Sequence, residues 1–212
     1  MSKVQLYKSL LDCKIFTMKD VTKNGDEEPF ILKFDTILSH PKLFDDYSLI
    51  IETQTKNSNL EFSKICAITP SSIPYATNIA TSLGKGLLFV TDTGNNHDEK
   101  NDIKNIKVNG GMNIDDNILL IDTIASDNYF LNNVIQKITK YGGNVVGVII
   151  IFDKQEGEYI NIVTQKIKTI PIINIYEMVM SLENNNIIDV FSSERIRFFC
   201  EKQMKKNIIK FC

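Results

Sequence analysis

The stretch Ile118-Leu-Leu-Ile-Asp-Thr-Ile-Ala-Ser-Asp-Asn-Tyr-Phe130 decides how the fold of this chain is interpreted. It begins with an apolar run that predicts a buried strand, continues through one acidic residue, Asp122, and leads through a polar turn into a helix. A strand–turn–helix segment binds phosphate when backbone N–H groups converge and the turn has small, uncharged side chains. Here Asp127 would repel a phosphate and Tyr129 would crowd it. The stretch therefore has the shape of a phosphate site without its chemistry.

Strands alternate with helices on both sides of this stretch. A nearly continuous apolar run at 144–152 is typical of a central parallel strand that is covered on both faces. Residues 91–111 are polar and have no apolar period, so they predict a long loop. The alternation predicts an α/β fold with a central, mainly parallel sheet flanked by helices. We expect strands at 29–34, 64–69, 86–90, 118–121, 144–152 and 171–174, and helices at 3–16, from Pro41, and at 73–83, 128–141, 176–182 and 193–206.

Size and composition exclude several classes of protein. The 212 residues, 43% of them hydrophobic and 24% charged, are enough for a globular domain with a sizeable core. A net charge of −2 gives no general attraction to nucleic acid or to an anionic membrane. No apolar run approaches the roughly 20 residues that span a bilayer, and the N-terminus does not have the pattern of a signal peptide. The four cysteines are scattered, which favours a reduced, cytoplasmic protein, and two histidines exclude a multi-His metal site.

Several blocks of sequence resemble orotate phosphoribosyltransferases, most closely the N-terminal domain of eukaryotic UMP synthase. The blocks lie in the family's order at residues 21–43, 65–77, 118–130 and 149–157. The resemblance covers roughly residues 7–205 and implies the type I phosphoribosyltransferase fold. It also implies a single domain, 1–212, with an N-terminal helix and hood segment (1–45) and a core (60–212).

The resemblance implies a diphosphate site in which the binding residues are replaced. The family's mobile loop carries an Arg-Lys pair and a further Lys, where this chain has Thr91, Asp92 and Asn95. His97 matches a histidine of that loop. Charge-assisted bonds supply most of the binding of a diphosphate, so replacing Lys with Asp is expected to cost several kcal/mol of transition-state stabilisation.

The positions around the ribose phosphate are also degraded. The family has two adjacent acidic residues that contact the ribose hydroxyls; Asp122 keeps the first position and Thr123 replaces the second. In the phosphate turn, Ser126 is followed by Asp127, and Asn128 stands in place of a glycine. In the turn that approaches the diphosphate, Ala67 replaces glycine and Thr69 replaces proline, and a β-carbon at Ala67 opposes close approach.

The orotate end of the site is better preserved. Lys23, Gly25 and Asp153 match the family, and Lys154 stands where the family uses arginine, although lysine lacks the planar fork that binds a carboxylate. An alternative role for Lys23, Asp153 and Lys154 is in structural ion pairs. The vestigial ligand-binding residues are therefore Lys23, Asp122, Ser126, Asp153 and Lys154.

Three functions are compatible with this pattern. The leading hypothesis is a catalytically inactive homologue with a structural or regulatory role, with no catalytic residue, no cofactor and no metal site. The second is an active enzyme that converts orotate and phosphoribosyl diphosphate to orotidine monophosphate, in which case Mg²⁺ would be needed. The third is a sensor that binds a nucleotide or orotate without turnover. Fold alone does not separate these hypotheses.

The expected partners are a second copy of the chain and an unidentified protein, with no membrane. The N-terminal segment and the helix after Pro74 resemble the dimer-forming parts of the family. A basic C-terminal helix that includes Arg195 and Lys202 is either a solvated outer helix or a docking site for an acidic partner or nucleic acid; without an aromatic platform we do not expect sequence-specific nucleic-acid binding. The abundance of Asn, Ile and Lys fits an AT-rich genome and would suit a captured host enzyme in a large DNA virus.

Overall fold

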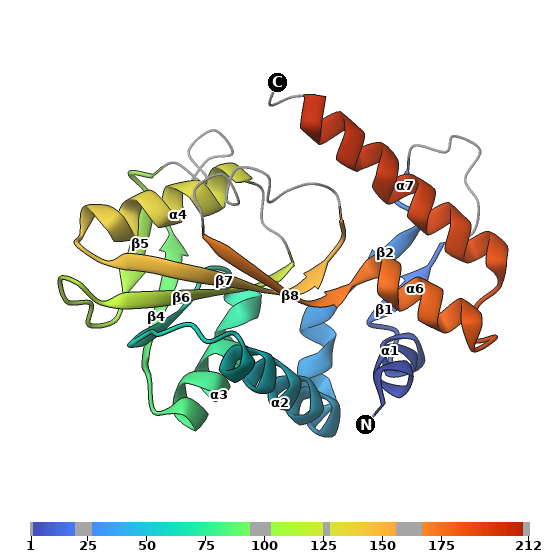
Figure 1. Cartoon of the computed structure of the whole chain (residues 1–212), viewed down its shortest axis with the longest axis horizontal. Coiled ribbons are helices and arrows are strands. Elements are labelled where there is room, and N and C mark those ends of the chain that lie inside the picture. Colours follow the sequence, from blue (N-terminus) through green and yellow to red (C-terminus); the bar gives the residue numbers. More distant parts are fainter. Residues whose placement is uncertain (1, 20–26, 94–102, 125–127, 156–166, 210–212) are drawn as a thin grey trace. The chain divides into compact units, whose positions relative to one another are not determined.

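The computed structural model describes residues 2–19, 27–93, 103–124, 128–155 and 167–209 (Figure 1). The chain divides into two compact units. The terminal unit comprises residues 1–47, 153–157 and 173–212, and the sheet unit comprises residues 48–152 and 158–172.

The sheet unit is built on a six-stranded sheet with the order β5-β4-β3-β6-β7-β8. β3 pairs in parallel with β4 and β6, and β6 pairs in parallel with β7, whereas β5 is antiparallel to β4. This arrangement confirms the predicted α/β class with a mainly parallel sheet. The strands are β3 (Lys64–Ala67), β4 (Gly86–Asp92), β5 (Ile106–Asn109), β6 (Asn117–Ile124), β7 (Asn144–Asp153) and β8 (Lys168–Asn174).

Helices cover both faces of this sheet, with α3 (Ile73–Leu83) and α4 (Asn128–Lys140) on opposite sides (Figure 1). α3 has the predicted bounds because a proline lies in its first turn and Gly84 ends it in the left-handed conformation, φ 62°. A short 3₁₀ turn, η2 (Pro70–Ser72), joins β3 to α3. No helix in the described part of the chain is long and apolar enough to cross a membrane.

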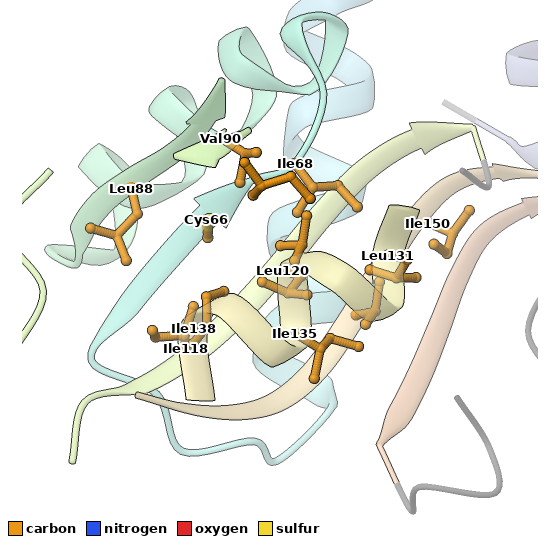
Figure 2. Packing of buried hydrophobic residues seen from close by; sticks show 13 residues of the cluster. Cys66, Ile68, Leu88, Val90, Ile118, Leu120, Leu131, Ile135, Ile138 and Ile150 are labelled. Atoms are coloured by element: carbon orange, nitrogen blue, oxygen red, sulfur yellow. The ribbon is translucent and has the colours of Figure 1, made fainter. Parts of the chain in front are cut away.

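The core of the sheet unit lies between the sheet and α4 (Figure 2). β6 is buried from Ile118 to Thr123, so both of its faces are covered and its sequence is continuously apolar before Asp122. Ile118 and Leu120 contribute to the cluster beneath α4, whose buried members are Cys66, Ile68, Leu88, Val90, Ile106, Ile118, Leu120, Leu131, Val134, Ile135, Ile138, Val148 and Ile150. This packing fixes the position at which the strands end.

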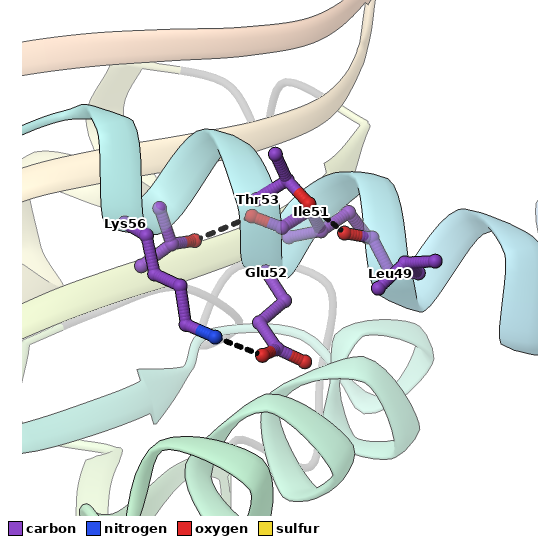
Figure 3. Close-up of polar contacts among 6 residues, drawn as sticks. Leu49, Ile51, Glu52, Thr53 and Lys56 are labelled. Atoms are coloured by element: carbon purple, nitrogen blue, oxygen red, sulfur yellow. Dashed lines mark hydrogen bonds and ion pairs between the residues drawn. The ribbon is translucent and has the colours of Figure 1, made fainter.

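The long helix α2 (Pro41–Asn57) begins at the predicted proline and is stabilised by short-range polar contacts (Figure 3). Lys56 Nζ lies 2.5 Å from Glu52 Oε1. This bond, together with a hydrogen bond from Ser82 on α3, lowers the pKa of Glu52. The hydroxyl of Thr53 donates to the carbonyl of Leu49 one turn earlier. Glu52 thus connects α2 to α3.

The predicted loop at residues 91–111 is wrong in its second half, where β5 pairs with the end of β4. Ile106 is buried and Val108 partly buried, and they alternate with polar residues, as expected of an edge strand. Four residues provide only two apolar positions, with Lys107 between them, and this is too few to show an alternation in the sequence. An edge strand next to a polar loop gives too short a pattern for periodicity alone.

The described part of the terminal unit contains a two-stranded antiparallel sheet and, besides the start of α2, three α-helices and one 3₁₀ helix. Its core includes stacked Phe16 and Phe30 rings, with Phe199 edge-on to Phe30. The helix predicted at 3–16 ends earlier because Lys14 adopts φ 54°, and the chain then enters β1. The elements are α1 (Lys3–Asp12), β1 (Phe16–Met18), β2 (Phe30–Leu32), η1 (Phe34–Ser39), α6 (Ile175–Asn184) and α7 (Val190–Ile209).

Gly110 follows β5, and a substitution at this position tests how closely the β4–β5 hairpin is packed. Its φ is +101°, and a β-carbon there would lie 2.7 Å from the carbonyl oxygen of Leu87. We expect Gly110→Ala to lower the free energy of unfolding by about 3 kcal/mol because backbone strain adds to a clash that cannot relax easily. Gly111→Ala is the matched control, since no atom lies within 4 Å of its added β-carbon. Urea denaturation would measure both, and equal effects would contradict the packing argument.

Candidate functional site

The candidate site lies at the carboxyl ends of β3 and β6. From β3 the chain continues to β4 on one side, and β6 lies on the other, so the strand order reverses between β3 and β6. Open α/β sheets bind ligands at such a switch point. Ala67 at the end of β3 is opposite Ile121, and the next amide, that of Ile68, donates to the carbonyl of Ile121 over 3.1 Å. The residues that follow these two strands are therefore held side by side.

The Asp122 carboxylate binds two donors from the protein itself. Its Oδ1 accepts a hydrogen bond from Thr69 Oγ1 at 2.8 Å and another from the backbone N–H of Thr123 at 2.8 Å. The Asp122 residue is 0% exposed. A buried carboxylate requires such partners because its desolvation is costly. Asp122 thus fastens the turn after β3 to the end of β6.

Hydroxyl groups extend this network along the same edge of the sheet. Ser71 Oγ and Thr123 Oγ1 are 2.6 Å apart, and Thr123 is buried. Ser72 accepts from the backbone N–H of Thr69 and donates to its carbonyl, which closes the 3₁₀ turn. The side chains Thr69, Ser71, Ser72, Asp122 and Thr123, hereafter the switch-point network, therefore bind one another.

Sequence reasoning identified Thr69, Asp122 and Thr123 but missed Ser71 and Ser72. The available signal was the run of hydroxyl residues directly after β3, which could have been matched with Asp122 and Thr123 near the end of β6, a strand that continues beyond the predicted bounds 118–121. Because the carboxyl ends of neighbouring parallel strands lie at one edge of the sheet, the side chains after β3 and those near the end of β6 are expected to lie close together. The missing information was that they would bind each other.

Two of the degenerate loop positions lie at the end of β4. Thr91 and Asp92 are both exposed and pair with Lys107 and Ile106 of β5, respectively. The Asn109 side-chain amide donates to Thr91 Oγ1 over 2.9 Å. This end of β4 therefore presents a neutral and an acidic side chain, and the exposed Lys107 of β5 lies opposite Thr91.

Several predicted positions lie outside the described residues: Lys23, Asn95, His97, Ser126 and Asp127. Asn128 is the first residue of α4. The expectation that Asp127 or Tyr129 fills the place of a phosphate therefore stays a prediction.

In the terminal unit, Asp153 is the last residue of β7 and Lys154 follows it, and these two predicted residues bind different partners. Asp153 is buried, and burial raises the pKa of its carboxyl group even though it accepts hydrogen bonds from the backbone N–H and side-chain amide of Gln155, which act in the opposite direction. Lys154 Nζ forms an ion pair with Glu28 Oε1 at 3.0 Å. Both residues thus have local structural contacts.

Comparisons with known proteins agree with the resemblance seen in the sequence. No family model matches the chain. Orotate phosphoribosyltransferase of Methanococcus maripaludis is 23% identical over 83% of this chain and 93% of its own length. The enzyme of the same name from Sulfurisphaera tokodaii is 25% identical over 93% of this chain and 98% of its own length.

A solved structure shows the same architecture. UMP synthase of Leishmania donovani superimposes with a TM-score of 0.73 and 16% identity, over 95% of this chain and 43% of that longer protein. At this identity the superposition shows the fold. This chain has the type I phosphoribosyltransferase fold and is similar in sequence to orotate phosphoribosyltransferases over most of its length.

Proposed function

We propose that this protein is a catalytically inactive homologue of orotate phosphoribosyltransferase that acts through protein contacts, as a structural or regulatory homodimer. The observation that carries the proposal is the burial of Asp122 within the switch-point network. A carboxylate that is 0% exposed and already accepts hydrogen bonds from Thr69 and from the Thr123 amide is covered, so a ribose hydroxyl could reach it only if this edge of the sheet opened. Opening the network would give up hydrogen bonds to a charged group, each of which contributes about 1.5–3 kcal/mol.

The end of β4 supports the same proposal. Transfer of a ribosyl group from a diphosphate leaves a strongly charged product, whose release is favoured by cations placed in advance. Thr91 and Asp92 at this end supply a hydroxyl and an anion instead. The resemblance assigns these two positions to cationic residues in the enzymes, so this chain has lost the cations there, although Lys107 of β5 lies opposite Thr91.

The alternative is an active orotate phosphoribosyltransferase, which the names of the relatives favour. In that case Lys23, Asp122, Asp153 and Lys154 would bind substrates, and Mg²⁺ would accompany the diphosphate. A sensor that binds orotate or a nucleotide without turnover stands between these two functions. Ligand binding and turnover therefore separate the three.

We expect no orotate consumption when the purified protein is mixed with orotate, phosphoribosyl diphosphate and Mg²⁺, and no rise in melting temperature with any of these or with orotidine monophosphate. A ligand at about 100 times its dissociation constant adds about 2.7 kcal/mol to stability and would be detected. An active orotate phosphoribosyltransferase assayed in parallel is the control. Turnover would reject the proposal, and a melting shift without turnover would replace it with the sensor.

A structural role for Asp122 predicts that its loss affects folding. Asp122→Ala leaves the Thr69 hydroxyl and the Thr123 amide without this acceptor, so we expect a loss of about 3 kcal/mol in unfolding free energy. Asp122→Asn keeps an oxygen acceptor and should lose less, about 1 kcal/mol. Chemical denaturation of both variants gives the comparison. If Asp122→Ala were as stable as the unchanged protein, the network would not be holding this edge of the sheet.

The buried carboxyl group of Asp153 predicts a specific pH dependence. Because its folded-state pKa is raised, the folded protein keeps a proton that the unfolded chain has already released, so stability falls as pH rises through the interval above the ordinary Asp value. We expect Asp153→Asn to remove this loss, so that its stability relative to the unchanged protein increases with pH across the acidic range and is then constant. Urea denaturation from acidic to neutral pH measures it.

Asp189→Asn is a control for which the change in stability with pH is expected to have the opposite sign. Hydrogen bonds from the backbone and hydroxyl of Ser192 lower the pKa of Asp189, so its contribution is present at neutral pH and is lost as pH falls. The Asn variant should therefore become relatively less stable with rising pH. The same pH trend in both variants would contradict the assignment for Asp153.

A further inference from the structure

The outward face of α7 carries two aromatic side chains that the packing of the terminal unit leaves uncovered. Phe191 is 63% exposed and Phe198 is 65% exposed. They are seven residues apart, which is close to two helical turns, so they share one face. Ile196 and Phe199 are buried on the other side of the helix. Large apolar side chains gathered on a surface mark an interaction site more strongly than single exposed ones.

Charged residues of both signs lie beside these rings. One turn after Phe191 come Glu194 and Arg195, and the guanidinium carbon of Arg195 is 6.0 Å from the Phe191 ring centre. After Phe198 come Glu201 and Lys202. An open groove of about 480 Å³ follows this face, lined by Phe191, Glu194, Arg195, Arg197, Phe198 and Glu201. A groove between two ridges of helix side chains can receive a ridge from a second helix.

The charged residues on this face are ordered so that the helix is complementary to an antiparallel copy of itself. If two α7 helices pair antiparallel with Phe198 at a two-fold axis, a residue before Phe198 faces the residue equally far after Phe198 in the second copy. Glu194 then faces Lys202, and Arg195, whose guanidinium also donates to the carbonyl of Lys19, faces Glu201, so both pairs have opposite charge. Phe191 faces Lys205, whose aliphatic stem can cover the ring and whose ammonium group can lie over its face.

Other arrangements lack this match. A parallel pair in register would set Glu194 against Glu194 and Arg195 against Arg195, which is repulsive. A nucleic acid or another polyanion would meet Glu194 and Glu201, both exposed, beside the basic residues. An isologous contact between two copies satisfies both charges and covers the rings.

We propose that this face of α7 is a homotypic docking surface, which packs antiparallel on α7 of a second copy with the two Phe198 side chains in contact at the axis. The surface lies in the terminal unit and uses none of the switch-point network. It therefore does not depend on whether the protein is an enzyme. If copies also associate through another surface, the α7 contact joins two such assemblies and doubles the number of copies.

The test measures molar mass by sedimentation across a concentration series for the full chain. Phe198→Glu removes one ring and adds one negative charge in each copy, so two rings are lost and two like charges face each other at the axis. We expect this variant to halve the measured molar mass. Glu194→Lys and Lys202→Glu should each weaken association by about tenfold or more, because each opposes like charges at two symmetric positions. The double variant Glu194→Lys with Lys202→Glu exchanges the charges and should restore association.

Ile114→Glu is the matched control, since Ile114 is 77% exposed in the sheet unit and lies outside the proposed surface. Its mass should equal that of the unchanged protein, and circular dichroism confirms that each variant is folded. An unchanged mass for folded Phe198→Glu, or failure of the double variant to recover association, would overturn the antiparallel arrangement. Detection of orotate turnover would reject the proposed function and leave these expectations unchanged.

Discussion

The hydrogen bond from Thr69 to Asp122 is the constraint on which the candidate site depends. It joins the turn after β3 to the end of β6 at the point where the strand order reverses, which is where this kind of sheet binds ligands. Parallel pairing of β3 and β6 aligns the two residues, and burial then makes their bond necessary because a desolvated carboxylate needs donors. β3 and β6, the two strands whose ends would form the ligand site, thus also bury its acidic residue, Asp122.

Retention of the fold is compatible with the proposed loss of the chemistry because the two rest on different residues. The sheet is held by apolar side chains such as Ile118, Leu120 and Val148, none of which would touch a substrate. The chemistry of a ribosyl transfer would rest on a few charged groups at the strand ends, and these can be exchanged without affecting the core. Relatives at 23–25% identity can therefore share an architecture with this chain while several polar side chains at the strand ends are exchanged.

The sequence was sufficient for elements with strong local signals and insufficient for contacts between distant segments. α3 was predicted at its observed bounds because Pro74 and Gly84 mark its two ends, and β7 was predicted to within one residue because residues 145–152 form an apolar run. β5 was missed because a four-residue edge strand has too few alternations. The pairing of Ser71 with Thr123 joins residues 52 positions apart, and only the register of the sheet decides that they meet.

A protein that loses its substrate contacts keeps whatever surfaces its fold presents. On α7 the rings of Phe191 and Phe198 remain largely in solvent, although burial of such rings is what usually stabilises a helix of this length. Their exposure is costly to solubility unless something covers them, and a palindromic order of charges around Phe198 makes the helix its own complement. Because α7 and the switch-point network belong to different units, substitutions in one should act independently of the other, which allows selection to relax at the site while the surface is maintained.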